Sequence, residues 1–211
     1  MVVDLGTGSG KAVLRRARQH PDELVIGIDA DAAHMADSSR RAAAAIRRGG
    51  VPNAHFIVAP VEELPGPLAG CASLVTIALP WGSLLRGLLA ADPQLVDAMK
   101  ACLRPVGEVQ ILLSATDRDS AASSTLVDDR DAARLASAFE VAGLRIVEWR
   151  PADASDVYAL SSGWGRRLGI PERRPAWFYR ARTAPEERQP RAPSCTRRAD
   201  GLASHASERG C

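Results

Sequence analysis

Residues 2–11 read VVDLGTGSGK, in which a short apolar run ends beside an acid and three glycines follow at alternate positions. The apolar run predicts a strand over Val2–Leu5, and the pattern from Lys11 to His20, closed by Pro21, predicts a helix. Glycines between a strand and a helix let a ligand approach the backbone closely, near the outward-pointing N–H groups of the helix. The sequence therefore predicts a ligand site at the end of the first strand.

Three kinds of ligand-binding loop contain glycines at similar spacing. A Walker loop needs GxxxxGK followed by Ser or Thr, whereas Gly6 and Gly10 are one residue too close and Ala12 follows Lys11. A dinucleotide loop has the spacing GxGxxG. The observed GxGxG after Asp4 resembles motif I of class I S-adenosylmethionine-dependent methyltransferases. That cofactor carries a methionyl ammonium and no pyrophosphate, so a carboxylate at the strand end is a suitable partner.

Hydrophobic runs alternate with helical patterns along the chain, which is typical of βαβ units around a mostly parallel sheet. The predicted fold is therefore α/β, Rossmann-like, with a mostly parallel seven-stranded sheet. Further strands are predicted over residues 24–29, 54–59, 73–79, 107–114, 144–149 and 176–182. Further helices are predicted over residues 31–48, from Trp81 to about 103, and over 132–142. Residues 151–175 are expected to form a long functional loop that contains Trp164.

Length and composition limit the number of domains and the classes of protein to which the chain can belong. A chain of 211 residues fits one domain, expected over 1–182, and a disordered tail is expected over 183–211, which is rich in Pro, Arg, Ser and Gly. The net charge is only +2. The four cysteines show no CxxC spacing, so neither a metal site nor a disulfide framework is predicted, and a cytoplasmic location is expected. No apolar run approaches about 18 residues, which argues against membrane insertion.

Two acids follow the next strands. Asp29 ends the second strand, where an acid can accept hydrogen bonds from ribose hydroxyls. The alternative is an N-cap for the following helix, a role that Asp31 can fill instead. Glu62 follows the third strand, where the adenine edge of a cofactor would lie, or it is an ordinary acid at a helix start.

Trp81 ends the fourth strand, where cofactor and acceptor meet in this fold. Enzymes that methylate an exocyclic adenine amine often carry Asn or Asp, two prolines and an aromatic here. Leu79-Pro80-Trp81 provides the aromatic face without a side-chain acceptor. A ring nitrogen such as adenine N1 needs no deprotonation, and stacking on tryptophan favours the positive charge that develops. Trp81 therefore indicates a ring nitrogen as the methyl acceptor.

Five segments in this order, DLGTGSGK, GIDAD, VEELP, LPWGSLLRG and SSGWGRRLG, resemble the 16S rRNA (adenine(1408)-N(1))-methyltransferases of the kanamycin–apramycin resistance type. The resemblance covers Val2 to Arg182. It implies methyl transfer from S-adenosylmethionine to N1 of adenine 1408 in the 30S subunit, and aminoglycoside resistance. It also implies that Trp81 and Trp164 sandwich the flipped adenine. Besides the motif I glycines Gly6, Gly8 and Gly10, the implied cofactor-binding residues are Asp4, Asp29, Val61, Glu62, Leu79 and Ser162.

The resemblance further implies that two arginine clusters hold the 30S surface. The first is Arg40, Arg41, Arg47 and Arg48, and the second is Arg166, Arg167, Arg173 and Arg174. From the residues alone, the first cluster can equally be a solvated helix face, and Trp164 can equally be a buried anchor for its loop. Family members carry an N-terminal β-hairpin before motif I, which has no counterpart here. A monomer without metal is expected. The alternatives are another RNA (tRNA) or small-molecule methyltransferase, and a truncated non-catalytic protein that binds cofactor or RNA.

Overall fold

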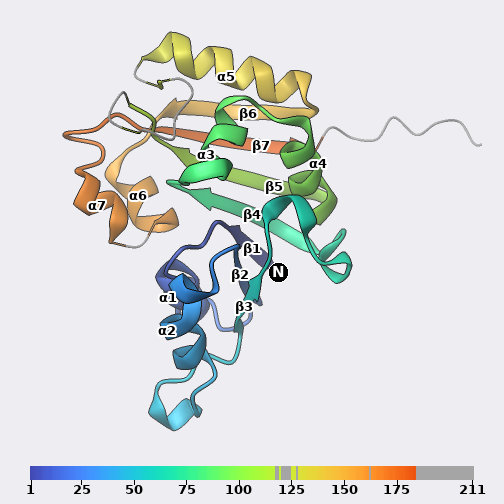
Figure 1. The fold of residues 1–211 in the computed structure, drawn as a ribbon, viewed down its shortest axis with the longest axis vertical. Helices are drawn as coiled ribbons and strands as arrows, with labels where there is room; N and C mark the ends of the chain where they lie inside the picture. The colour runs from blue at the N-terminus through green and yellow to red at the C-terminus, as the bar shows by residue number, and fades with distance from the viewer. Residues whose placement is uncertain (117–118, 120–124, 127, 162, 184–211) are drawn as a thin grey trace, which may run out of the picture.

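The computed structural model describes residues 1–116, 119, 125–126, 128–161 and 163–183. Its strands are β1 Val2–Leu5, β2 Val25–Asp29, β3 Ala54–Val58, β4 Ala72–Ala78, β5 Leu103–Leu113, β6 Leu144–Pro151 and β7 Trp177–Thr183. They form one sheet in the order β3-β2-β1-β4-β5-β7-β6 (Figure 1). The pairs among β1 to β5 are parallel, and β7 is antiparallel to both β5 and β6. The prediction of an α/β fold with a mostly parallel seven-stranded sheet is confirmed.

The helices connect these strands. They are α1 Lys11–Gln19, α2 Ala32–Ala42, α3 Gly82–Leu89, α4 Pro93–Cys102, α5 Asp129–Val141, α6 Ala154–Leu160 and α7 Trp164–Leu168. Short 3-10 turns are η1 Ile46–Arg48, η2 Val61–Glu63 and η3 Gly66–Leu68.

Three expectations about helices were wrong. The helix predicted over 31–48 ends at Ala42, and η1 follows separately. The helix predicted after Trp81 is split into α3 and α4, because Asp92 caps a new helix with Pro93 in its first turn. Residues 151–175 are not a loop, since they hold α6 and α7. Both helices have too few turns to show a helical period in the sequence.

Helices cover both faces of the sheet. One apolar cluster joins α3, α4 and α5 to the sheet, and a second joins α1 and α2 to β1, β2 and β3. A third cluster joins α6 to the ends of β4, β5 and β7. Strand side chains alternate between clusters, as a half-buried pleat requires: Trp177 lies in the first and Phe178 in the third. Trp177 is buried and Trp149 half-buried, as expected for residues of the last two strands.

The sheet brings the predicted site residues together at the carboxyl ends of its parallel strands. The arrowhead of β4 points toward the side of the molecule where α6 and α7 lie (Figure 1). Ligands bind outside the carboxyl ends of parallel strands in open α/β sheets. Among the described residues, no helix is long and apolar enough to cross a membrane.

Candidate functional site

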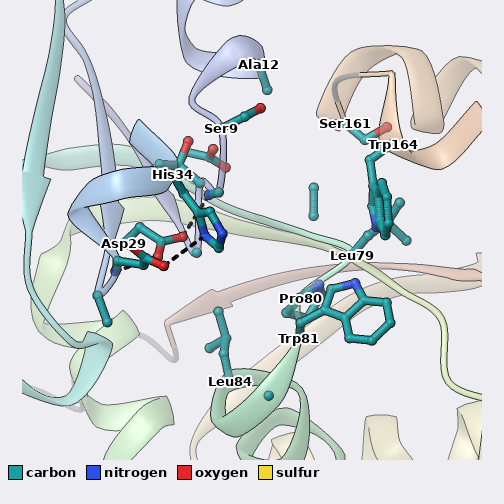
Figure 2. Close-up of a pocket in the computed structure, with 18 of the residues that line it drawn as sticks. Ser9, Ala12, Asp29, His34, Leu79, Pro80, Trp81, Leu84, Ser161 and Trp164 are labelled. Carbon is teal, nitrogen blue, oxygen red and sulfur yellow. Dashed lines mark hydrogen bonds and ion pairs between the residues drawn. The ribbon is translucent and has the colours of Figure 1, made fainter. Parts of the chain in front are cut away.

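A cavity of about 1190 Å³ lies at the carboxyl ends of β1, β2 and β4. Figure 2 shows Asp29 and His34 on one side of it and Trp81 and Trp164 on the other. Of the predicted cofactor-binding residues, the cavity is lined by Asp4, Gly6, Gly8, Asp29, Val61, Glu62 and Leu79. Ser162 lies outside the described residues, although its neighbours Ser161 and Gly163 line the cavity. The sequence therefore identified residues from four separate loops that the fold brings together.

Two glycines of the loop after β1 line the cavity. Gly6 and Gly8 have φ of 68° and 53°, a left-handed conformation that favours glycine. A Cβ atom at Gly6 would lie 2.5 Å from a methyl group of Leu84. Gly10 differs, because it does not line the cavity and a Cβ there would overlap the ring of Phe56. The expectation that Gly10 contacts the cofactor is therefore not supported, and packing explains this glycine.

Asp4 is a buried carboxylate that faces the cavity. Its side chain is held by Thr76, whose hydroxyl donates to Asp4 Oδ1 at 2.7 Å. Burial raises the pKa of Asp4 to about 6, and the hydrogen bond from Thr76 only partly opposes the rise. Such a carboxylate gains most from a cationic ligand, because a neighbouring positive charge favours its ionised form.

Asp29 ties the first two strand ends together. Its carboxylate accepts from the backbone N–H of Gly8 at 2.7 Å and from that of Asp31 at 2.9 Å. Asp31, and not Asp29, caps α2, since its side chain accepts from the N–H of Ala33. The N-cap alternative for Asp29 is therefore wrong. Each Asp29 oxygen accepts one of these bonds, which leaves lone pairs for hydroxyl donors in the cavity.

Leu79 links the cavity to the third apolar cluster. Its φ is 52°, which is uncommon for a leucine, and its N–H donates to the carbonyl of Leu112 at 2.8 Å. Its buried side chain packs in the cluster that contains Val157 and Leu160 of α6. Of the described non-glycine residues with positive φ, which are Leu79, Ala91 and Val106, Leu79 lines the cavity, and backbone strain of this kind is common at functional sites.

The two predicted tryptophans meet across the cavity. Their ring centroids lie 6.1 Å apart, with 62° between the ring planes. Trp81 is 50% exposed and Trp164 39% exposed, although both are large apolar side chains. The alternative interpretation of Trp164 as a buried anchor is therefore wrong.

Gly165 sets the position of Trp164. A Cβ atom there would overlap Val157, lie 2.9 Å from the hydroxyl of Ser161 and lie 3.4 Å from Leu79. The absence of a side chain at Gly165 thus allows α7 to pack directly on α6 and on the end of β4.

The first arginine cluster is exposed. Arg40 and Arg41 in α2 both pair with the carboxylate of Asp37, at 3.6 Å and 3.1 Å. Arg47 and Arg48 lie in η1 and are exposed. Exposed pairs of this kind are weak and leave the guanidinium groups available to phosphates.

The second cluster lines a separate hollow of about 880 Å³ beside α7. Arg166, Arg167 and Arg173 are exposed there, and Arg167 also lines the first cavity. Arg174 is different, since its side chain is only 14% exposed and its Nη2 lies 2.5 Å from Asp119. Its Nε donates to the hydroxyl of Ser114 at 2.7 Å. The expectation that Arg174 contacts RNA is therefore not supported, because it forms a buried ion pair within the fold.

Some cavity residues were missed by the sequence analysis. They are Lys11, His34 and Ser83, and Arg167 was expected only at the RNA surface. His34 lies three residues after Asp31 and approaches it at 3.5 Å, a spacing that could have indicated it. Among the described residues, no group of three or more His, Cys, Asp or Glu could hold a metal ion.

Comparison with known proteins identifies close relatives. The family model described as NpmA, 16S rRNA (adenine(1408)-N(1))-methyltransferase, matches residues 1–183. The 16S rRNA (adenine(1408)-N(1))-methyltransferase of Streptoalloteichus hindustanus is 37% identical over 177 residues, 80% of each chain. A mutant of such an enzyme from Catenulisporales acidiphilia, solved with its cosubstrate SAM, is 28% identical with a TM-score of 0.77, and the match covers 90% of this chain and 87% of that one. The antibiotic-resistance methyltransferase Kmr is 34% identical with a TM-score of 0.71, covering 87% and 86%.

Proposed function

Since the chain belongs to the family of 16S rRNA (adenine(1408)-N(1))-methyltransferases, we propose that it transfers a methyl group from S-adenosylmethionine to N1 of adenine 1408 in the 30S subunit. The modification would protect the ribosome from aminoglycosides. The observation that carries the proposal is the pair of exposed tryptophans at the rim of a cavity that fits this cofactor.

The cavity fits S-adenosylmethionine by the chemistry of its polar groups. Asp4 is a buried carboxylate whose charge a methionyl ammonium would compensate. Asp29 holds free lone pairs for ribose hydroxyls, and Gly6 and Gly8 leave room at the backbone. Val61 and Glu62 would hold the adenine, and Leu79 the methionyl part. When bound, the cofactor supplies an electrophilic methyl group.

The residues around Trp81 suit a ring nitrogen as acceptor. Leu79, Pro80, Gly82 and Ser83 carry neither a carboxylate nor an imidazole that could remove a proton. Adenine N1 attacks through its own lone pair, and the base then carries a positive charge. Tryptophan faces stabilise that charge by cation–π attraction, so the site needs no general base.

The two rings also offset the cost of base flipping. Taking an adenine out of its stack costs a few kcal/mol, and stacking on an aromatic side chain returns roughly 1–3 kcal/mol per face. The exposed arginines of the two clusters, which exclude Arg174, would attract rRNA phosphates. We further propose that the protein acts in the cytoplasm, as a monomer without metal, on the assembled 30S subunit.

The test is methyl transfer to purified 30S subunits with labelled S-adenosylmethionine, followed by primer extension across the decoding region. N1 methylation blocks base pairing, so reverse transcription should stop at adenine 1408. The matched control is a 30S subunit with guanine at position 1408, which should take no label. Labelling of tRNA instead of 30S would support the alternative of another RNA methyltransferase. Absence of labelling on every substrate would overturn the proposal.

A further inference from the structure

Arg15 connects helix α1, which follows the glycine loop, to the segment that carries Trp164. It lies in α1, directly after the glycine loop, and is half-buried. Its Nη1 donates to the carbonyl of Ser161 at 2.7 Å, and its Nη2 donates to the carbonyl of Ala159 at 3.0 Å. Both contacts cross more than half of the chain length in sequence, so they fix two distant segments relative to each other.

The acceptors of these bonds are carbonyls at the end of a helix. Ser161 is the C-cap of α6, and Ala159 lies in its last turn, where carbonyls have no partner within the helix. The partial negative charge at the C-terminal end of a helix also attracts a guanidinium group. The same guanidinium lies 5.2 Å from the centroid of the Tyr158 ring. Arg15 therefore meets α6 with two hydrogen bonds and one ring contact.

The other end of α6 is held by a different arginine. Arg150 in β6 contacts Asp156 through both guanidinium nitrogens, at 2.5 Å and 2.9 Å. Arg150 belongs to β6, the strand that leads into α6, so this pair fixes the helix only to the strand next to it in the sequence. Arg15 instead sets the distance between α6 and the loop of Gly6 and Gly8.

That distance matters for the proposed reaction. Ser161 lines the cavity, and Trp164 follows shortly after it in the chain. A shift of about 1 Å in the relative position of two reacting groups can lower a rate about 100-fold. We propose that Arg15 is a positioning residue, which holds the Trp164 ring in the place that methyl transfer requires relative to the cofactor-binding loop. This role rests on the proposed methyl transfer.

The test compares Arg15→Ala with Arg16→Ala, which removes an adjacent arginine of α1 that pairs with Glu23. We expect Arg15→Ala to lower kcat on 30S subunits about 100-fold, with KM for 30S and cofactor Kd within about threefold. Arg15→Lys, which cannot donate in a fork, should recover only part of the rate. Added guanidinium ion should raise kcat of Arg15→Ala and leave Arg16→Ala unchanged. Cofactor affinity is measured at about pH 8, where Asp4 is ionised.

Hydrogen exchange tests the contact itself. Amides of residues 157–161 and 163–168 should exchange about tenfold faster in Arg15→Ala than in the wild type or Arg16→Ala. Unchanged exchange, or a kcat within about twofold of the wild type, would overturn the role of Arg15. An equal loss of cofactor affinity and kcat would also overturn it, because Arg15 would then act in cofactor binding. If wild-type protein labels no 30S while exchange responds as expected, the proposed function fails and the contact stands.

Discussion

Trp81 and Trp164 meet edge to face, with ring centroids 6.1 Å apart and 62° between the ring planes. An adenine between two parallel rings needs about 7 Å, that is, two contacts of about 3.5 Å. Both side chains are exposed. We expect an adenine that enters between them, as proposed, to turn the two rings parallel and to move them slightly apart.

Removal of either ring should lower methyl transfer without loss of cofactor binding. We expect Trp81→Ala and Trp164→Ala each to reduce kcat/KM on 30S by about 5- to 150-fold, the equivalent of roughly 1–3 kcal/mol of stacking. Phenylalanine at either position should recover part of the rate. Trp149→Phe, on β6 and outside the cavity, is the control and should retain full activity. Full transfer by both alanine variants would contradict the sandwich.

Asp4 should destabilise the protein without cofactor at neutral pH. Its pKa is about 6 when folded and 3.8 in the unfolded reference, so the folded chain binds the proton more tightly. The stability from this group is present below pH 3.8 and is lost as the pH rises through about 6. Asp4→Asn, which can still accept from Thr76, should raise the unfolding free energy at neutral pH by about 2–3 kcal/mol. Urea unfolding of the wild type, Asp4→Asn and the exposed-site control Asp22→Asn measures this. A lower stability of Asp4→Asn would contradict it.

The same carboxylate should make cofactor affinity depend on pH. The ammonium of the cofactor pairs with ionised Asp4, so affinity should fall about tenfold for each pH unit below about 6. Calorimetry with S-adenosylhomocysteine, which keeps the ammonium and transfers no methyl, gives Kd over this range. Asp4→Asn should bind weakly with a flat profile. A wild-type Kd that does not change between about pH 5 and 8 would rule out this pairing.

Gly165 should be intolerant of even one methyl group. Gly165→Ala would force α7 away from Val157 and Leu79, and overpacking of this kind costs about 1–3 kcal/mol. The displacement of Trp164 should lower transfer to 30S while cofactor affinity stays the same. Gly163→Ala is the matched control, because its Cβ would lie 3.9 Å from the Arg166 side chain. Thermal unfolding and methyl transfer measure both effects, and equal behaviour of the two variants would refute the packing argument.

Replacement of the neighbouring residues Arg173 and Arg174 should affect different properties, 30S binding for Arg173 and stability of the fold for Arg174. Arg174→Ala leaves the buried carboxylate of Asp119 without its partner and should destabilise the fold by about 3 kcal/mol. Arg173→Ala removes an exposed charge and should leave the melting temperature unchanged. It should instead weaken 30S binding and reduce the dependence of that binding on salt concentration. Filter binding at several salt concentrations and thermal unfolding separate the two, and a stable Arg174→Ala protein would contradict the assignment.

Strong local signals made much of the fold predictable. Val2–Leu5 is a short strand of three apolar residues and Asp4, followed directly by glycines, and these features are visible within ten residues. Asp4 and Asp29 were predictable because Asp4 lies next to the end of β1 and Asp29 ends β2. The order of the strands, β3-β2-β1-β4-β5-β7-β6, was not predicted and comes from the structure.

Long-range packing was not predictable. Arg173 and Arg174 are identical in the sequence, and only the fold places Asp119 and Ser114 beside the second of them. Gly10 looks like Gly6 and Gly8, yet the Phe56 ring, from a distant strand, occupies the space beside it. Partners of this kind depend on which segments meet, which no local pattern reports.

The segment with α6 and α7 leaves the sheet at Pro151 and returns at Trp177, which are paired residues on adjacent antiparallel strands. Its two ends therefore start and finish at one place, as in a hairpin. The pairing of β6 with β7 is therefore independent of the length of the segment between them. Arg15 and Arg150, which lie outside the segment, hold the two ends of α6 and so fix its place relative to the sheet.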